Sequence, residues 1–184
     1  MKKLVSFFMF LLLCLGFLTC KKKCERVTCI NSGIYNGCEC VCPPEWTGAH
    51  CEELSVPTAI ILHEVTLLRY PQFNGPSDWD LGNGPDLIFE ILDTLGHSIY
   101  IHNAPIDDVD VTVLDEYTWS NSDIKLADPF AEYIIELWDD DVNQDDFMGS
   151  AFFIPYWHGN GFQDTLFIDE GGAVAFLIPI SYEF

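Results

Sequence analysis

The sequence predicts an all-β protein, an eight-stranded antiparallel β-sandwich preceded by a small cysteine-rich module. All eight cysteines lie between Cys14 and Cys51. After residue 57, apolar or alternating segments rich in Ile, Leu and Val are separated by clusters of Gly, Pro, Asn and Asp, as strands are separated by turns. No stretch of that part carries a helical period of apolar residues. Eight short strands at such spacing are typical of a β-sandwich.

The expected strands follow a short linker at 53–58 and belong to one domain, 57–184. The longest run near its start, 59–69, alternates between apolar and polar residues, which favours a strand with one buried face. The expected strands are 59–69, 87–92, 98–101, 109–113, 132–138, 149–154, 165–168 and 173–182.

The first twenty residues have the character of an export signal. Lys2 and Lys3 precede an apolar run, 4–18, which is too short for an ordinary membrane-spanning helix. The run ends in Phe-Leu-Thr-Cys, which resembles the lipobox of bacterial lipoproteins. The resemblance implies a signal peptide at 1–19, a lipid anchor on Cys20, and a place in the cell envelope as an outer-membrane lipoprotein on either face. A plain signal peptide with Cys20 used otherwise is the alternative.

Residues 24–52 form a compact unit in which six cysteines follow the spacing C-x4-C-x8-C-x-C-x-C-x8-C. About thirty residues cannot bury enough apolar surface to fold alone, so disulfides must hold the unit. Six cysteines allow many pairings, and the sequence does not choose among them.

The same unit resembles an EGF-like module, through Asn-Ser-Gly at 31–33 and the run from Cys42-Pro-Pro through Trp-Thr-Gly at 46–48 to Cys51. The basic run 21–23 stands where calcium-binding members of that family carry acidic residues, which favours a spacer role. The resemblance implies the pairs Cys24–Cys38, Cys29–Cys40 and Cys42–Cys51.

Charge is distributed unevenly along the chain, whose formal net charge is −21. From residue 55 onward only Arg69 and Lys125 are basic, against 24 acidic residues, so that part carries a formal −22. Nucleic acid is excluded as a partner because phosphate binding needs clustered Lys and Arg. The same surface repels anionic lipids unless a metal cation intervenes.

Two segments, 78–86 and 138–149, break the strand pattern with dense acid. Asp is common in turns, and a run of charge is often only solvated. However, crowded carboxylates repel one another and cost stability unless a cation compensates them. Calcium accepts six to eight oxygen ligands in the loose geometry that loops can offer. The two segments therefore predict a calcium site.

The spacing of these acids resembles that of a C2 domain, an eight-stranded sandwich that binds calcium between loops at one end. Two aspartates stand six residues apart in the first segment, the second of them opening a strand. The other segment reads Trp-Asp-Asp-Asp, then Asp-Phe-Met-Gly. The resemblance implies that calcium is bound by Asp80, Asp86, Asp139, Asp141 and Asp146, with the backbone carbonyl of Asp140. Whether Asp145 or Asp146 makes the last contact is open, and Phe73 and Trp79 are candidates for membrane contact.

These observations favour a binding module over an enzyme. The histidines share no metal-ligand spacing, no Gly-x-Ser-x-Gly motif occurs, and the domain has no cysteine nucleophile. The expected function is an envelope-anchored module that docks to phospholipid or lipopolysaccharide phosphates through bound calcium. The alternative is an adhesion module whose calcium rigidifies loops that bind an envelope protein or glycan.

Overall fold

The computed structural model describes residues 26–80, 84–113, 115–120, 123–142, 144–159 and 161–184. The chain forms two compact units, Met1–Glu53 and Leu54–Phe184, which divide within the segment expected to be a linker. The expected signal peptide, Cys20 and Cys24 lie outside the described residues. In the part of the chain that is described, no helix has the length and apolar character needed to cross a membrane.

The first unit is held by disulfides. Cys29 is bonded to Cys40 and Cys42 to Cys51, which are two of the three expected pairs, and Cys38 is also disulfide-bonded. Cys51 is fully buried, whereas most other described residues of the unit are exposed. Two short hairpins complete it: β1 (Ile34–Tyr35) pairs with β2 (Cys40–Val41), and β3 (Trp46–Thr47) pairs with β4 (Glu53–Leu54).

In the second unit, one sheet is built from six strand segments that form four continuous strands. These segments are β5 (Ala59–Leu62), β6 (Val65–Arg69), β9 (Tyr117–Trp119), β10 (Ile124–Leu126), β13 (Thr165–Ile168) and β14 (Ala175–Glu183). β5 and β6 both pair with β14, and β10 and β9 pair with β5 and β6 in turn. Each of these two pairs of segments is therefore one strand with a short interruption, and β13 lies on the other side of β14.

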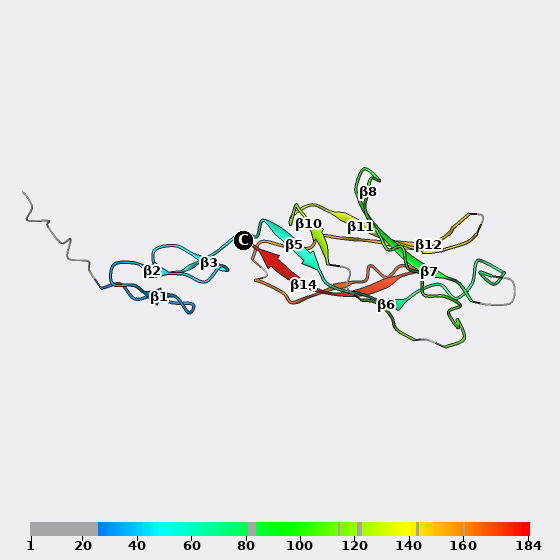
Figure 1. The fold of residues 1–184 in the computed structure, drawn as a ribbon, viewed down its shortest axis with the longest axis horizontal. Coiled ribbons are helices and arrows are strands. Elements are labelled where there is room, and N and C mark those ends of the chain that lie inside the picture. Colours follow the sequence, from blue (N-terminus) through cyan, green and yellow to red (C-terminus); the bar gives the residue numbers. More distant parts are fainter. Residues whose placement is uncertain (1–25, 81–83, 114, 121–122, 143, 160) are drawn as a thin grey trace, which may run out of the picture. The chain divides into compact units, whose positions relative to one another are not determined.

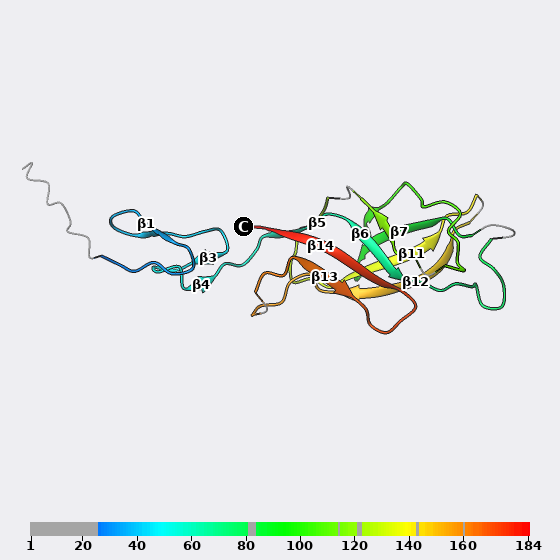
Figure 2. The same cartoon turned by 90° about the horizontal axis from the view of Figure 1, so that it is seen from below.

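The other sheet has four strands in the order β12-β11-β7-β8, all antiparallel. They are β7 (Leu87–Asp93), β8 (Ser98–Ile101), β11 (Tyr133–Asp139) and β12 (Asp146–Phe153). With the four continuous strands of the first sheet, the described residues form the eight-stranded antiparallel β-sandwich that the sequence predicts. Figures 1 and 2 both show the segments after β6 and after β11 at the end of this unit that lies away from the chain's C-terminus.

The core lies between the two sheets. Leu62 and Phe176 from one sheet and Phe89 and Leu137 from the other are fully buried and belong to one apolar cluster. Burying a side chain of this size stabilises the fold by about 1.5–3 kcal/mol. Along β7 and β11 buried residues alternate with partly exposed ones, as expected when one face of a strand packs on the core.

Two details of the expected strand order are wrong. The segment 109–113 is a loop, because Asp110 accepts hydrogen bonds from both the backbone N–H and the hydroxyl of Thr112 and its carbonyl accepts one from the N–H of Val113. Such local bonds satisfy the backbone without a partner strand. The strand that was missed is β9 with β10, whose apolar pattern is divided by the polar residues between Trp119 and Ile124.

Candidate metal centre

Asp139 stands at a core-facing position at the end of a buried strand. In β11 the buried side chains alternate from Tyr133 through Ile135 and Leu137 to Asp139. The period of two that places the apolar residues in the core therefore also turns this carboxylate inward. Asp139 is 0% exposed, and among the residues that the structure describes no other charged residue is buried.

The two carboxylate oxygens of Asp139 differ in their surroundings. Oδ1 accepts a hydrogen bond of 2.7 Å from the backbone N–H of Asp86. Oδ2 is buried and has no hydrogen-bond partner. An ionised oxygen without a partner is costly in a buried place. The structure thus contains a buried acceptor directed at a site that no protein donor fills.

Burial raises the pKa of Asp139 to about 6, from an ordinary value of 3.8. The hydrogen bond from the Asp86 N–H works against this rise, while the negative charges of Asp80, Asp141 and Asp86 add to it. The site therefore disfavours the ionised form of this carboxyl unless positive charge is supplied.

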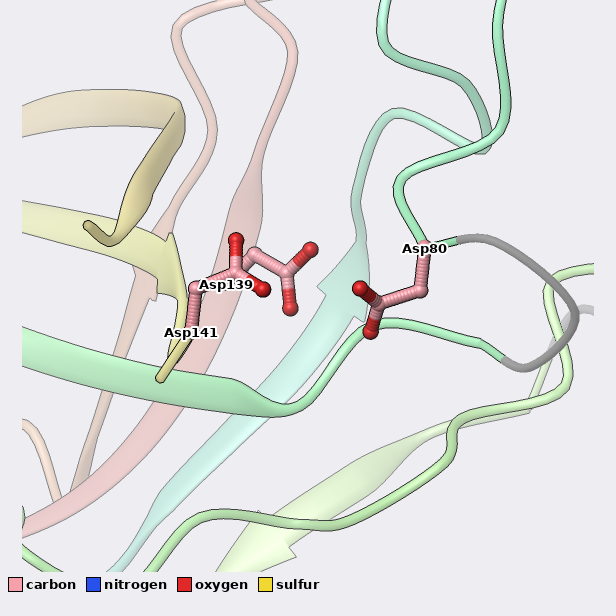
Figure 3. A group of neighbouring side chains, drawn as sticks. All are labelled: Asp80, Asp139 and Asp141. Carbon is pink, nitrogen blue, oxygen red and sulfur yellow. The ribbon is translucent and has the colours of Figure 1, made fainter. Parts of the chain in front are cut away.

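Three carboxylates meet at this point. Ligand oxygens of Asp80, Asp139 and Asp141 all lie within 4.8 Å of one another. Figure 3 shows the Asp139 and Asp141 carboxylates next to each other, facing the carboxylate of Asp80 on the loop between β6 and β7. The pKa of Asp80 is raised by burial and then by the charges of Asp141, Asp86 and Asp108. These neighbours are all acidic, so their charges further disfavour the ionised form of Asp80.

The other expected ligands lie beside this group. The Asp86 Oδ1 accepts a 2.7 Å hydrogen bond from the backbone N–H of Asp108, and the carboxylate of Asp146 accepts one of 3.2 Å from the Asn74 amide. Asp140 is exposed, and its N–H donates to the carbonyl of Asp86. Neither Asp86 nor Asp146 is among the three clustered carboxylates of the described residues, so their ligand roles stay predictions.

Asp145 supports the loop from within. Its Oδ1 accepts a 3.2 Å hydrogen bond from the backbone N–H of Asp141. This bond ties the backbone of Asp141 to a side chain four residues further along the chain. Asp145 therefore positions the backbone of Asp141. From the sequence alone, Asp145 was considered only as an alternative to Asp146 for the last calcium contact.

A third acidic segment contributes to the site and was missed from the sequence. Asp108 has a backbone φ of 53°, its N–H binds Asp86, and its charge helps to raise the pKa of Asp80. The available signal was the Asp-Asp pair at 107–108, beyond the expected strand at 98–101. The segment also lines a cavity of about 450 Å³ together with Asp78, Trp79 and Pro85.

The group has the chemistry of a site for a hard divalent cation. It offers carboxylate oxygens alone, at mutual distances that one ion can span, and one of them is buried without a partner. Calcium tolerates irregular oxygen coordination from loops, whereas magnesium demands near-octahedral geometry and retains its waters. The residues present therefore fit calcium better than magnesium.

Apolar side chains at the same loops differ in exposure. Phe73 is exposed, but Trp79 is half-buried against the core, and its indole N–H donates a 2.9 Å hydrogen bond to the carbonyl of Pro71. Val142, between the acids of the second loop, is fully exposed. Of the two candidates for membrane contact, Phe73 is accessible without rearrangement, and Val142 is an additional one.

Gly84 shows how closely the first and third loops approach. A Cβ at this position would lie 1.6 Å from the carbonyl oxygen of Val109, which is backbone and cannot move aside locally. We expect Gly84→Ala to separate these loops, lower the free energy of unfolding by about 1–3 kcal/mol, and weaken metal binding. Denaturant unfolding measures the first effect. Gly75→Ala is the control for the change itself, since a Cβ there meets no atom within 4 Å, although its φ of 63° adds strain.

A second polar network lies on the outward face of the sheet that contains β5, β6 and β14. His63 Nδ1 is 2.9 Å from Asp123 Oδ1, and His63 Nε2 is 2.8 Å from Ser181 Oγ. A serine, histidine and aspartate so connected have the order of a nucleophilic triad, but such a relay acts in a site that excludes water. Because the side chains of His63 and Asp123 are 44% and 74% exposed, the network favours a role in joining strands.

Comparisons with known proteins find similarity at the level of structure. No protein family and no curated protein matches the sequence. A structure described as a C2 domain has a TM-score of 0.37 at 13% identity, covering 67% of this chain and 97% of the other. The first C2 domain of a plant extended synaptotagmin 1 has 0.35 at 15% identity, with coverages of 70% and 97%.

The third similar structure holds the two C2 domains of extended synaptotagmin 2, and it has a TM-score of 0.38 at 16% identity. The alignment covers 78% of this chain and about half, 47%, of that one. At such values the likeness carries no functional argument, and the metal site rests on the contacts described above.

Proposed function

We propose that this protein is a calcium-binding docking module, with calcium held by Asp80, Asp139 and Asp141. The observation that carries the proposal is the unpartnered Oδ2 of fully buried Asp139, which faces two other carboxylates. A buried carboxylate with one satisfied and one orphaned oxygen is stable when a cation completes it. The raised pKa of Asp139 expresses the same cost in the cation-free protein.

Three features of the structure position the residues of such a site. β11 fixes Asp139 by its inward register, the Asp86 N–H orients its Oδ1, and Asp145 holds the backbone of Asp141. Bound calcium would supply positive charge and free coordination positions for phosphate or carboxylate oxygens of a partner. Phe73 and Val142, exposed on the neighbouring loops, can contact the apolar part of a lipid interface.

The bound surface in this proposal is a phospholipid or lipopolysaccharide phosphate layer. A formal charge of −22 beyond residue 55 makes such a surface repulsive without the metal. The two basic residues of this unit do not compensate, because Arg69 is paired with Asp169 and Lys125 with Glu183. Docking should therefore depend entirely on calcium.

The rest of the chain fits export and anchoring. We propose that 1–19 is a lipoprotein signal, that Cys20 carries lipid, and that the disulfide-linked unit is an EGF-like spacer at the bacterial outer membrane. The disulfide-bonded cysteines of the first unit agree with folding in an oxidising compartment. Acyl chains on Cys20 would keep the second unit near the membrane surface.

Sedimentation with vesicles tests the function. We expect the protein to pellet with phosphatidylserine vesicles or lipopolysaccharide in millimolar calcium. It should stay in solution when a chelator is added, and it should not pellet with phosphatidylcholine vesicles. Asp141→Asn should abolish pelleting, while Asp78→Asn, which removes the same charge from an exposed side chain, should not. Calcium-dependent stability without pelleting would instead support a calcium-rigidified module that binds an envelope protein or glycan.

A further inference from the structure

The outward face of the four-stranded sheet is largely apolar, although it does not face the core. We call this the outer face, and it comprises the alternate residues of β7, β11 and β12 and one from β8. Phe147 and Phe152 on it are 50% and 43% exposed. Its residues are Ile88, Glu90, Leu92, Ile101, Ile134, Glu136, Trp138, Phe147, Ser150 and Phe152. Contiguous apolar surface of this kind on a soluble unit marks an interaction site.

Cross-strand register arranges the outer face in rows. Ile134 lies opposite both Leu92 and Phe152. Trp138 lies opposite Ile88 and Phe147, and the centroids of the Trp138 and Phe147 rings are 5.1 Å apart. These two apolar rows therefore flank a middle row on both sides.

The middle row holds two acids directly opposite each other. Glu90 and Glu136 are Cα partners across β7 and β11, and Ile101 pairs with Glu90 on the other side. Like charges at opposed positions destabilise a sheet. The pKa of Glu136 is raised by burial and by the charge of Glu90, although a 3.1 Å hydrogen bond from the Trp138 indole N–H opposes the rise.

A small cavity lies beside this acidic pair. It has a volume of about 230 Å³ and is lined by Ile88, Glu90, Ile101, Trp138 and Asp145. Such a volume accepts one side chain rather than a drug-sized ligand. Carboxylates, here those of Glu90 and Asp145, together with an indole ring form the surroundings preferred by a guanidinium group, which binds carboxylates through paired N–H groups and stacks on aromatic rings.

We propose that the outer face binds an extended segment of a partner protein that inserts an arginine side chain between apolar side chains. The arginine would lie between Glu90 and Trp138, and the flanking apolar side chains would cover the Ile88 and Ile134 rows. The second unit does not supply this cation itself, because its two basic residues, Arg69 and Lys125, are paired with Asp169 and Glu183.

The two other possible occupants are disfavoured by the same charges. A second copy of the outer face would bring two more carboxylates against Glu90 and Glu136. A lipid layer would bury both charges in hydrocarbon or set them against anionic headgroups. Neither occupant supplies the positive charge that the middle row lacks.

Peptide binding tests the proposal, with chelator present so that the calcium site plays no part. The probe is a fluorescent peptide with blocked ends, Ile-Thr-Arg-Thr-Ile, which in extended form presents arginine and both isoleucines on one side. Its control carries citrulline, which has nearly the same shape without charge. By fluorescence anisotropy, we expect the arginine peptide to bind about 10-fold more tightly.

Variants separate the charge from the apolar surface. In the double variant Glu90→Gln/Glu136→Gln the advantage of the arginine peptide should fall, with the Asp145 carboxylate remaining in the cavity, whereas Phe152→Ser should weaken both peptides by a similar factor. Unfolding curves check that each variant is folded. Equal binding of both peptides to the wild-type protein would overturn the proposal. So would dimer formation in sedimentation velocity, or binding to phosphatidylcholine vesicles, that Phe152→Ser abolishes.

Discussion

Replacing Asp139 with Asn should weaken calcium binding on the order of 100-fold, since removing one partner of a buried charge pair costs about 3 kcal/mol. The same change should stabilise the calcium-free protein. The neutral amide keeps an oxygen for the Asp86 N–H and places N–H donors beside the carboxylates of Asp80 and Asp141, where Oδ2 now stands without a partner.

The stability gain should be on the order of 2 kcal/mol at about pH 7, where Asp139, with its pKa of about 6, is mostly ionised. Denaturant unfolding in chelator and calorimetric titration with calcium measure the two effects. Asp78→Asn is the matched control, because it removes the same charge two residues from Asp80, at an exposed side chain. Destabilisation of the calcium-free protein by Asp139→Asn would show that this carboxylate is not strained.

In chelator, the wild-type protein should become more stable as the pH falls from about 7 to about 5. The folded state binds a proton at Asp139 with a pKa of about 6, above the ordinary value of 3.8. Unfolding therefore releases a proton in this range, and acidification favours the folded state by about 1 kcal/mol from this group. Asp80 and Asp140, whose pKa values are also raised, act in the same direction.

Calcium should reverse this dependence. Ligand carboxylates must be ionised to bind the metal, so calcium affinity falls as Asp139 takes up its proton. A concentration of one hundred times the dissociation constant stabilises the folded state by about 2.7 kcal/mol, and this gain should shrink on acidification. Thermal unfolding over this range, with and without calcium, measures both trends.

Other titrating side chains also make stability depend on pH, and they decide which pH range and which control are used. Asp93, Asp110 and Asp169 have lowered pKa values, so they reduce stability only when the pH falls toward 4 and below. Burial lowers the pKa of His102, so this group opposes the trend of Asp139 between about pH 7 and about pH 5. The test is therefore the difference between the wild-type protein and Asp139→Asn. Parallel pH curves for the two would refute the role given to Asp139.

The sandwich could be predicted from the sequence because most of its strands are apolar segments separated by clusters of turn-forming residues. β7 and β11 are short runs rich in Ile and Leu that adjoin acidic loops, and this is visible in the residues alone. The segment 109–113 alternates between Val and polar residues, as a strand with one buried face does, but Asp110 closes a local turn through Thr112 and Val113. The strand formed by β9 and β10 was missed because its polar interruption divides two very short apolar segments.

The metal centre was predictable in part for a similar reason. Asp139 continues the inward positions of β11, and the sequence spacing brings Asp141 beside it. The role of Asp108 depends on a contact with Asp86 across 22 residues, which no local pattern contains. The hydrogen bond that draws Asp146 to Asn74 is equally non-local.

Calorimetric titration of calcium into the intact, disulfide-bonded chain tests the central claim most directly. Wild-type protein should bind calcium with release of protons at about pH 6, because Asp139 is partly protonated there before binding. Asp141→Asn should bind far more weakly, and Asp78→Asn should bind as the wild-type protein does. Absence of binding to the wild-type protein at millimolar calcium, or unchanged affinity in Asp141→Asn, would contradict the assignment of Asp80, Asp139 and Asp141 as the calcium site.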